Sequence, residues 1–158
     1  DTSPARDVFG AATWEATMVL DDGSPLAPLE ELQAEHRRLL ALARTLTVAR
    51  SRSDEEPPEW AELVGLLEEH TAKEEDGVFR QARRTAPIGD EIDAFCVEHA
   101  DLLGRVAGGF SSSETVDTLK LLVVQVNGEE RDLFPRVIEV LDHRQWAEVA
   151  ASHHRLGS

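Results

Sequence analysis

Apolar residues recur at three- and four-residue steps along four stretches of the chain, the spacing that one buried face of an α-helix requires. Proline early in the first two stretches and serines before the fourth are typical of helix starts. The predicted helices begin at Pro25 or Pro28, at Pro58, after Asp90 and after Ser111–Glu114, and the first three end before the polar segment 51–58, near Arg84 and before Gly108-Gly109.

The fold that this pattern predicts is all-α. Alternating apolar and polar positions are almost absent, which argues against a sheet, and short connections favour antiparallel neighbours. Pro135 falls inside the fourth stretch and predicts a kink, while Asp142 can cap a short last helix. We expect an up-down-up-down antiparallel four-helix bundle over residues 25–158, with a short C-terminal helix. Residues 1–24 read as an irregular arm lying over the domain.

Five polar residues interrupt the apolar stripes. Because a buried imidazole or carboxylate without a partner costs several kcal/mol, such residues point to a shared task. In a bundle the stripes face one axis, so the five side chains would converge and could hold a metal ion. Nitrogen and oxygen donors suit iron, manganese or zinc, and a single cysteine, Cys96, excludes a thiolate cluster. The candidate ligands are His36, His70, Glu74, His99 and Glu129.

Two motifs occur twice, in an order that indicates a duplicated helical hairpin. Residues 35–40 (EHRRLL) return as 98–103 (EHADLL), and residues 70–79 (HTAKEEDGVF) return as 125–134 (QVNGEERDLF). The repeat places Gln125 where a histidine is expected.

These motifs resemble the hemerythrin-like, or HHE cation-binding, domains over roughly residues 25–150. The matching features are a histidine on the first and third helices and a His-x-x-x-Glu motif on the second, degenerate on the fourth, with Glu-Glu-x-x-[Val/Leu]-Phe following. The resemblance implies a non-haem di-iron site with histidines as terminal ligands and two glutamates as bridges. Carried over to this chain, the ligands are His36, His70, Glu74, His99 and Glu129.

The amide of Gln125 is a weaker, neutral donor than imidazole. Three outcomes stay open: a di-metal site with Gln125 as ligand or in its surroundings, a mononuclear site, and a metal-free relic. The chain contains no tyrosine, which excludes a tyrosinate ligand and tyrosyl-radical chemistry.

The resemblance implies a protein that binds, senses or scavenges dioxygen, peroxide or nitric oxide. One alternative is a degenerate bundle that acts as a protein-interaction or regulatory module, with a mononuclear, structural or absent metal. A zinc hydrolase using Glu74 or Glu129 as base is a weaker alternative, since no H-E-x-x-H helix is present.

The net charge of the chain limits the classes of molecule that it could bind. With 31 acidic and 16 basic residues the formal net charge is −15, which opposes nucleic acid and the anionic face of a membrane. No apolar run approaches the ~20 residues that span a bilayer, and the single cysteine fits a reducing compartment. We therefore predict a cytoplasmic protein that binds neither nucleic acid nor a membrane.

Other polar residues have simpler interpretations. Glu75, Asp76, Glu130 and Asp132 beside the seam are expected to form a solvated acidic face. Three C-terminal histidines are expected at the surface or in the tail: His143, His153 and His154.

Overall fold

The computed structural model describes residues 26–85 and 88–157, and within these ranges it contains helices and no strand. The predicted all-α class is confirmed for this part of the chain, whereas the predicted arm, residues 1–24, lies outside it. The elements are α3 (Leu26–Arg52), α4 (Pro58–Asp76), α5 (Val78–Arg83), α6 (Gly89–Val106), α7 (Thr115–Gly128), the π-helical turn η1 (Glu129–Leu133), α8 (Phe134–Val140) and α9 (His143–Gly157).

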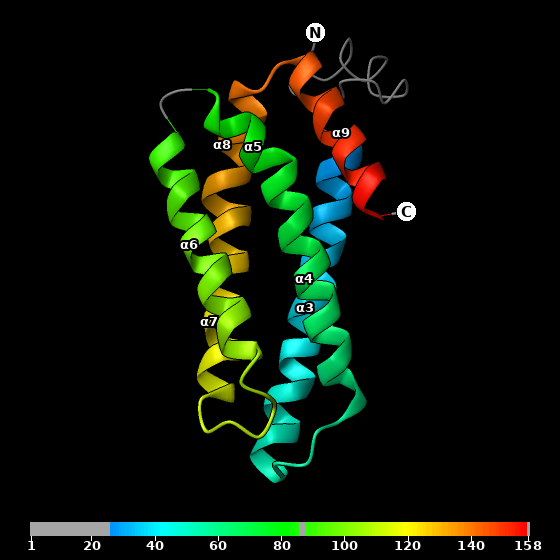
Figure 1. Ribbon diagram of the computed structural model, residues 1–158, viewed down its shortest axis with the longest axis vertical. Helices are drawn as coiled ribbons and strands as arrows, with labels where there is room; N and C mark the ends of the chain where they lie inside the picture. The colour runs from blue at the N-terminus through cyan, green and yellow to red at the C-terminus, as the bar shows by residue number, and fades with distance from the viewer. Residues whose placement is uncertain (1–25, 86–87, 158) are drawn as a thin grey trace, which may run out of the picture.

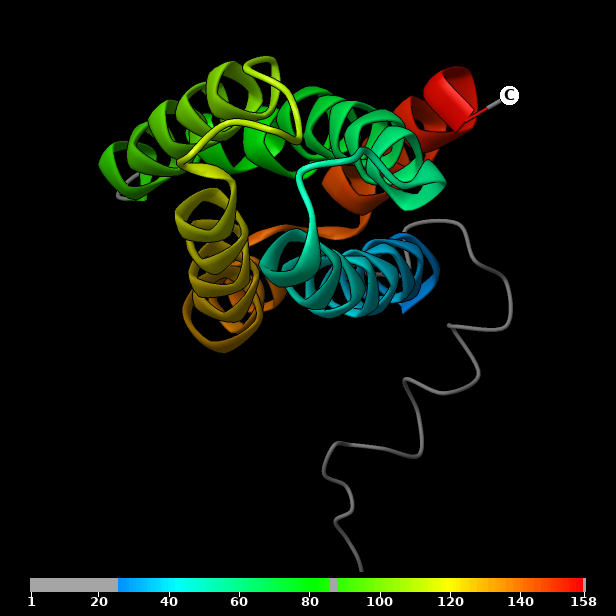
Figure 2. The same cartoon turned by 90° about the horizontal axis from the view of Figure 1, so that it is seen from below.

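The long helices lie side by side along the longest axis of the molecule (Figure 1). Figure 2 shows α4 and α6 on one side and α3 and α7 on the other. Each of these helices packs on two of the others, and α9 covers one end, against α3, α4 and α5. None of the described helices combines the length and apolar content that crossing a bilayer requires.

The second predicted helix is interrupted at Gly77, so its expected continuity to Arg84 is wrong. The backbone of Gly77 has φ −105° and ψ −94°, and α4 ends before it while α5 starts after it. A Cβ atom at this position would lie 2.9 Å from the carbonyl oxygen of Lys73 and 3.3 Å from Cγ1 of Val149. Close packing of the Lys73 carbonyl and of Val149 therefore favours glycine here.

The fourth predicted helix contains an irregular turn that ends two residues before Pro135. In η1 the N–H of Phe134 donates to the carbonyl of Glu129, five residues back, so the turn is one residue wider than an α-turn. Proline has no N–H to donate to the preceding turn. This π-turn, which begins at a candidate ligand, is the departure from α-helical geometry that the structure shows next to Pro135, where a kink was predicted.

The apolar interior forms two clusters on either side of a polar layer. On α3, Leu32 belongs to one cluster and Leu39 to the other, with His36 between them, and on α6 Ile92 and Leu102 lie on either side of His99 in the same way. The first cluster includes Phe79, Phe134 and Trp146, and the second includes Trp60, Leu63 and Phe110. The helices therefore hold the candidate ligands in a water-poor layer within the bundle.

Candidate metal centre

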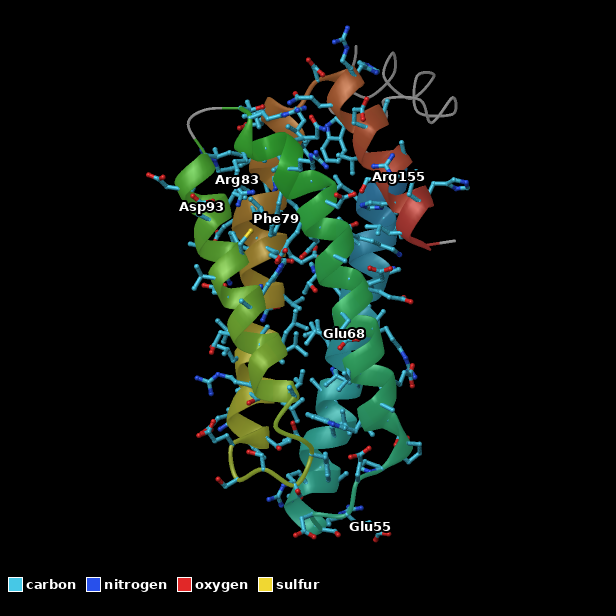
Figure 3. All side chains as sticks on the ribbon, viewed as in Figure 1. Glu55, Glu68, Phe79, Arg83, Asp93 and Arg155 are labelled. Carbon is cyan, nitrogen blue, oxygen red and sulfur yellow. The ribbon has the colours of Figure 1, made fainter. Side chains whose placement is uncertain are left out.

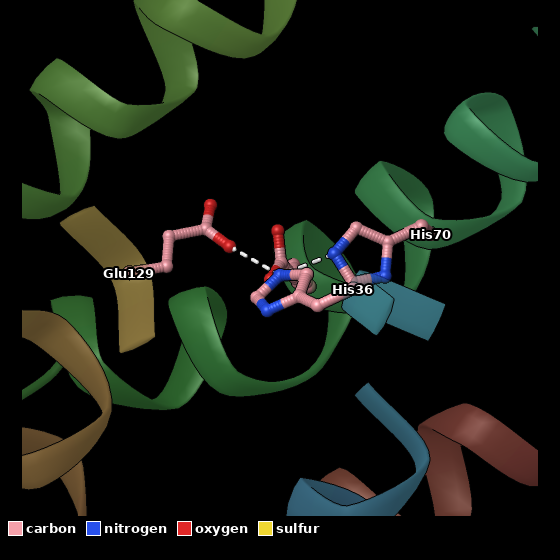
Figure 4. Close-up of side chains that lie close together, drawn as sticks. His36, His70 and Glu129 are labelled. Atoms are coloured by element: carbon pink, nitrogen blue, oxygen red, sulfur yellow. Dashed lines mark hydrogen bonds and ion pairs between the residues drawn. The ribbon is translucent and has the colours of Figure 1, made fainter. Parts of the chain in front are cut away.

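The five candidate ligands meet in this polar layer, and each is almost fully buried. They come from α3, α4, α6 and η1, so they are close only because the bundle folds. Donor atoms of His36, His70, Glu74 and Glu129 all lie within 4.8 Å of one another. Figure 4 shows His36, His70 and Glu129 directed toward a common point. Donors about 2.1 Å from one ion lie up to roughly 4 Å apart, so this group fits a single cation with small adjustments.

The two carboxylates each span the layer, with one oxygen on each side. Oε2 of Glu74 lies 3.4 Å from Nε2 of His36 and 3.0 Å from Nε2 of His70. Its Oε1 lies 3.1 Å from Nε2 of His99. Glu129 repeats the arrangement, with Oε1 2.9 Å from Nε2 of His36 and Oε2 3.1 Å from Nε2 of His99. Carboxylates placed in this way can serve two ions at once.

The two sides of the polar layer differ in the number of histidines that they contain. His36 and His70 supply two imidazoles to one side, whereas His99 is the one histidine that the structure brings to the other, among the residues it describes. Gln125, one helical turn before Glu129, is only 6% exposed, and neither its amide nitrogen nor its amide oxygen has a hydrogen-bond partner. An unsatisfied buried amide costs about 1–3 kcal/mol.

Other buried donors also lack hydrogen bonds of normal geometry: both carboxylate oxygens of Glu74 and Nε2 of His70. Once Nε2 of His70 has lost its proton, all of these atoms offer lone pairs, and a divalent cation is the group that several converging lone pairs would satisfy. The residues therefore fit a metal ion.

Each histidine also donates a hydrogen bond from Nδ1 to a glutamate on another helix. A carboxylate can only accept here, which fixes the proton on Nδ1 and leaves Nε2 facing the centre. The pairs are His36 with Glu130 at 2.5 Å, His70 with Glu35 at 2.7 Å, and His99 with Glu75 at 2.9 Å.

Two of these acceptors correct the sequence interpretation. Glu75 and Glu130 were expected to be purely solvated, yet each binds a histidine while remaining 44% and 33% exposed. Asp132 does lie on the outside, with its side chain 70% exposed. The repeat offered a signal for the difference, because the Glu-Glu pair occurs in both copies.

The phenylalanine that ends each repeated motif stacks on a histidine. The ring of Phe134 lies parallel to that of His36, with centroids 5.5 Å apart and an interplanar angle of 5°. Phe79 stacks on His99 at 5.2 Å and 16°. Figure 3 shows Phe79 among the interior side chains. Each copy of the motif therefore holds one histidine by both nitrogens and by its ring face.

The buried charges change the protonation of the histidines. Burial lowers the pKa of each, but hydrogen bonds and charge from neighbouring carboxylates outweigh burial, chiefly from Glu129 and Glu74 for His36 and His99. For His70 the carboxylates are Glu74 and Glu35. The pKa rises to about 10 for His36, about 9 for His70 and about 12 for His99. In the metal-free protein these rings are therefore cationic at neutral pH.

The pKa values of Glu129 and Glu74 shift in opposite directions. Burial and the negative charge of Glu74 raise the pKa of Glu129 to about 7. Burial raises the pKa of Glu74, but the positive charge of His70 and the close contacts with His36 and His99 hold its pKa well below the ordinary value. Protons thus supply the positive charge that this layer of carboxylates requires when no cation does so.

A family model described as the Hemerythrin HHE cation binding domain matches residues 27–137, more than half of the chain. The matched span contains all five candidate ligands and ends before α9. No curated protein and no solved structure matches the chain. The chain belongs to the hemerythrin HHE cation-binding domain family.

Proposed function

We propose that the protein is a non-haem iron protein with a di-iron centre, built on an up-down-up-down four-helix scaffold spanning residues 25–158. The proposed ligands are His36, His70, Glu74, His99 and Glu129. The observation that carries the proposal is the placement of two carboxylates with one oxygen on each side of the polar layer. Manganese or zinc would use the same donors.

Within this centre Glu74 and Glu129 act as bridges, because each offers its two oxygens to different histidines. The histidines cap the ends, with their Nε2 atoms oriented by the glutamates at Nδ1. Apolar clusters on both sides of the layer restrict water and large molecules.

We propose dioxygen, peroxide or nitric oxide as the ligand that the centre binds, senses or scavenges. A ferrous pair, when bound, would supply open positions and electrons to such molecules. The burial of every candidate ligand supports a small reactant over a substrate that needs an open groove. The net charge of −15 and the single cysteine support a cytoplasmic protein without nucleic-acid or membrane partners.

The two sides of the centre should fill in sequence. The side with His36 and His70 has two imidazoles and oxygens from two carboxylates, so it should take the first ion. Gln125 occupies the position of His70 in the repeat, which would assign it to the side with His99, and its unsatisfied amide supports a role as weak ligand or hydrogen-bond donor there.

Metal analysis of protein purified from iron-rich medium tests the proposal. We expect one to two irons per chain and near-ultraviolet absorption from a bridged pair. Glu74→Ala should abolish binding, whereas Glu69→Ala, an exposed carboxylate on the same helix, should leave it unchanged. Metal-free unaltered protein from such medium would contradict the proposal.

A further inference from the structure

The C-terminal helix α9 lies outside the region that the family model matches, yet it packs directly over the metal-centre helices (Figure 1). Its approach depends on the break at Gly77, where an added Cβ would lie 3.3 Å from Val149 and 3.4 Å from the ring of His153. Ser152 Oγ also donates to Asp76 at 2.8 Å. The helix is therefore seated closely on the end of α4.

His153, which the sequence interpretation placed at the surface, is only 4% exposed, so that expectation is wrong, whereas His143 and His154 are exposed as expected. Nδ1 of His153 donates to Oε1 of Glu31 on α3 at 3.1 Å. The sequence did carry a signal for this burial, because His153 lies seven residues after Trp146 and four after Val149, on the same buried face of α9.

Lys73 lies beside this pair and is buried, although it carries a charge. Its Nζ donates to Oε2 of Glu31 at 2.6 Å and to Oε2 of Glu35 at 2.6 Å. Removing an ammonium group from water is costly unless opposite charges and hydrogen bonds compensate, and these two carboxylates provide both. Lys73 therefore fixes Glu31 and Glu35 relative to each other.

Glu35 completes a continuous path to the metal centre. Its other oxygen, Oε1, accepts the Nδ1 hydrogen bond of His70 at 2.7 Å. The side chain of Glu35 is 14% exposed, against 44% for Glu75, the equivalent partner of His99. The order of the path is His153, Glu31, Lys73, Glu35, His70, with donors and acceptors alternating.

We propose that His153 and Lys73 are positioning residues of the metal centre: through Glu31 and Glu35 they fix the ring of His70, so that docked α9 is part of the binding site. This inference rests on the proposed function, since it assigns His70 as a ligand. It predicts that a change on α9, distant in sequence from every ligand, alters the metal site.

The test uses Co²⁺ as probe, because its visible spectrum reports ligand geometry. His153→Leu removes the donor to Glu31, and His153→Asn keeps an N–H near the same position. His143→Leu, at the exposed start of α9, is the matched control. We expect His153→Leu to bind Co²⁺ about 10-fold more weakly and with an altered spectrum, because it loses a partner that helps to orient a ligand. His153→Asn and His143→Leu should match the unaltered protein in affinity and spectrum.

A second measurement guards against misfolding and does not need the metal. Circular dichroism checks that each variant is helical, and NMR of the metal-free protein follows exchange of the Nδ1–H of His70 with solvent. Exchange should speed up in His153→Leu and in Lys73→Met, while the Nδ1–H of His99, bonded to Glu75, should be unaffected.

The outcomes separate the two proposals. A folded His153→Leu protein with unchanged Co²⁺ affinity, spectrum and His70 exchange would overturn the positioning role and leave the proposed function intact. Failure of the unaltered protein to bind Co²⁺ would overturn the proposed function itself.

Discussion

Glu130 accepts a 2.5 Å hydrogen bond from Nδ1 of His36, a residue 94 positions earlier in the chain. The neighbouring Glu129 contacts Nε2 of the same ring at 2.9 Å. Two consecutive glutamates thus hold both nitrogens of one imidazole, and the π-turn that contains them brings both toward α3. The consequence is that a half-exposed side chain determines how a buried ligand is oriented.

Replacing this outer partner should weaken metal binding. Glu130→Gln removes the charge that strengthens the hydrogen bond to His36, so we expect about 10-fold lower affinity in competition with a chelator of known strength. Asp132→Asn, on the same turn but 70% exposed, is the control and should be neutral. Equal affinities for both variants would show that Glu130 does not support the ligand.

Gln125→His should raise iron occupancy toward two ions per chain. The substitution restores the imidazole that the repeat expects, and imidazole is a better donor than an amide. Asn127→His, exposed on the same helix, controls for adventitious binding by an added histidine. Iron measured per chain after identical loading decides the matter, and equal or lower occupancy in Gln125→His contradicts the weak-ligand account.

Chelation should lower the melting temperature. An ion that binds only the folded chain stabilises it by mass action, by about 2.7 kcal/mol at a concentration 100 times the Kd. For a protein of this size that corresponds to roughly 5–10 °C. Calorimetry with and without chelator measures the shift. An unchanged melting temperature would instead favour the interaction-module alternative.

Metal binding should release protons and strengthen as the pH rises. His36 and His70, with pKa values of about 10 and about 9, are protonated at neutral pH in the metal-free protein, and each must lose its proton from Nε2 to coordinate. We expect release of roughly two protons from these histidines for the first ion, with a further fraction from Glu129, whose pKa is about 7. Calorimetric titrations in buffers of different ionisation enthalpy give this number, and a value near zero would contradict the protonation described above.

The metal-free protein should show the opposite dependence on pH. The folded-state pKa of each of these histidines lies above the ordinary value of 6.5, so their ion pairs stabilise the fold fully below that pH. This contribution is lost progressively from about pH 6.5 through the folded-state values of about 9 and about 10. Denaturant unfolding of chelated protein should therefore show a falling free energy of unfolding over this range. A flat profile would exclude these ion pairs as stabilising.

Periodicity predicted the helices and the interruption of their apolar stripes because both depend on which face of a helix is buried. It could not show the break at Gly77, since the pattern of Leu67, His70 and Val78 continues through it. The roles of Glu75 and Glu130 were missed for a related reason. A carboxylate at the edge of the polar layer resembles a solvated one in sequence, and only the packing of helices brings a histidine to it.

The polar layer divides the apolar interior of the bundle, so the cluster that contains Leu32 and the cluster that contains Leu39 do not form one continuous core. A cation bound in this layer would link the two apolar ends of the bundle, which in the metal-free protein are separated by protonated histidines. Removing the cation should allow the two ends of the bundle to unfold locally and independently of each other. Amide hydrogen exchange would then show two groups of residues with separate opening free energies.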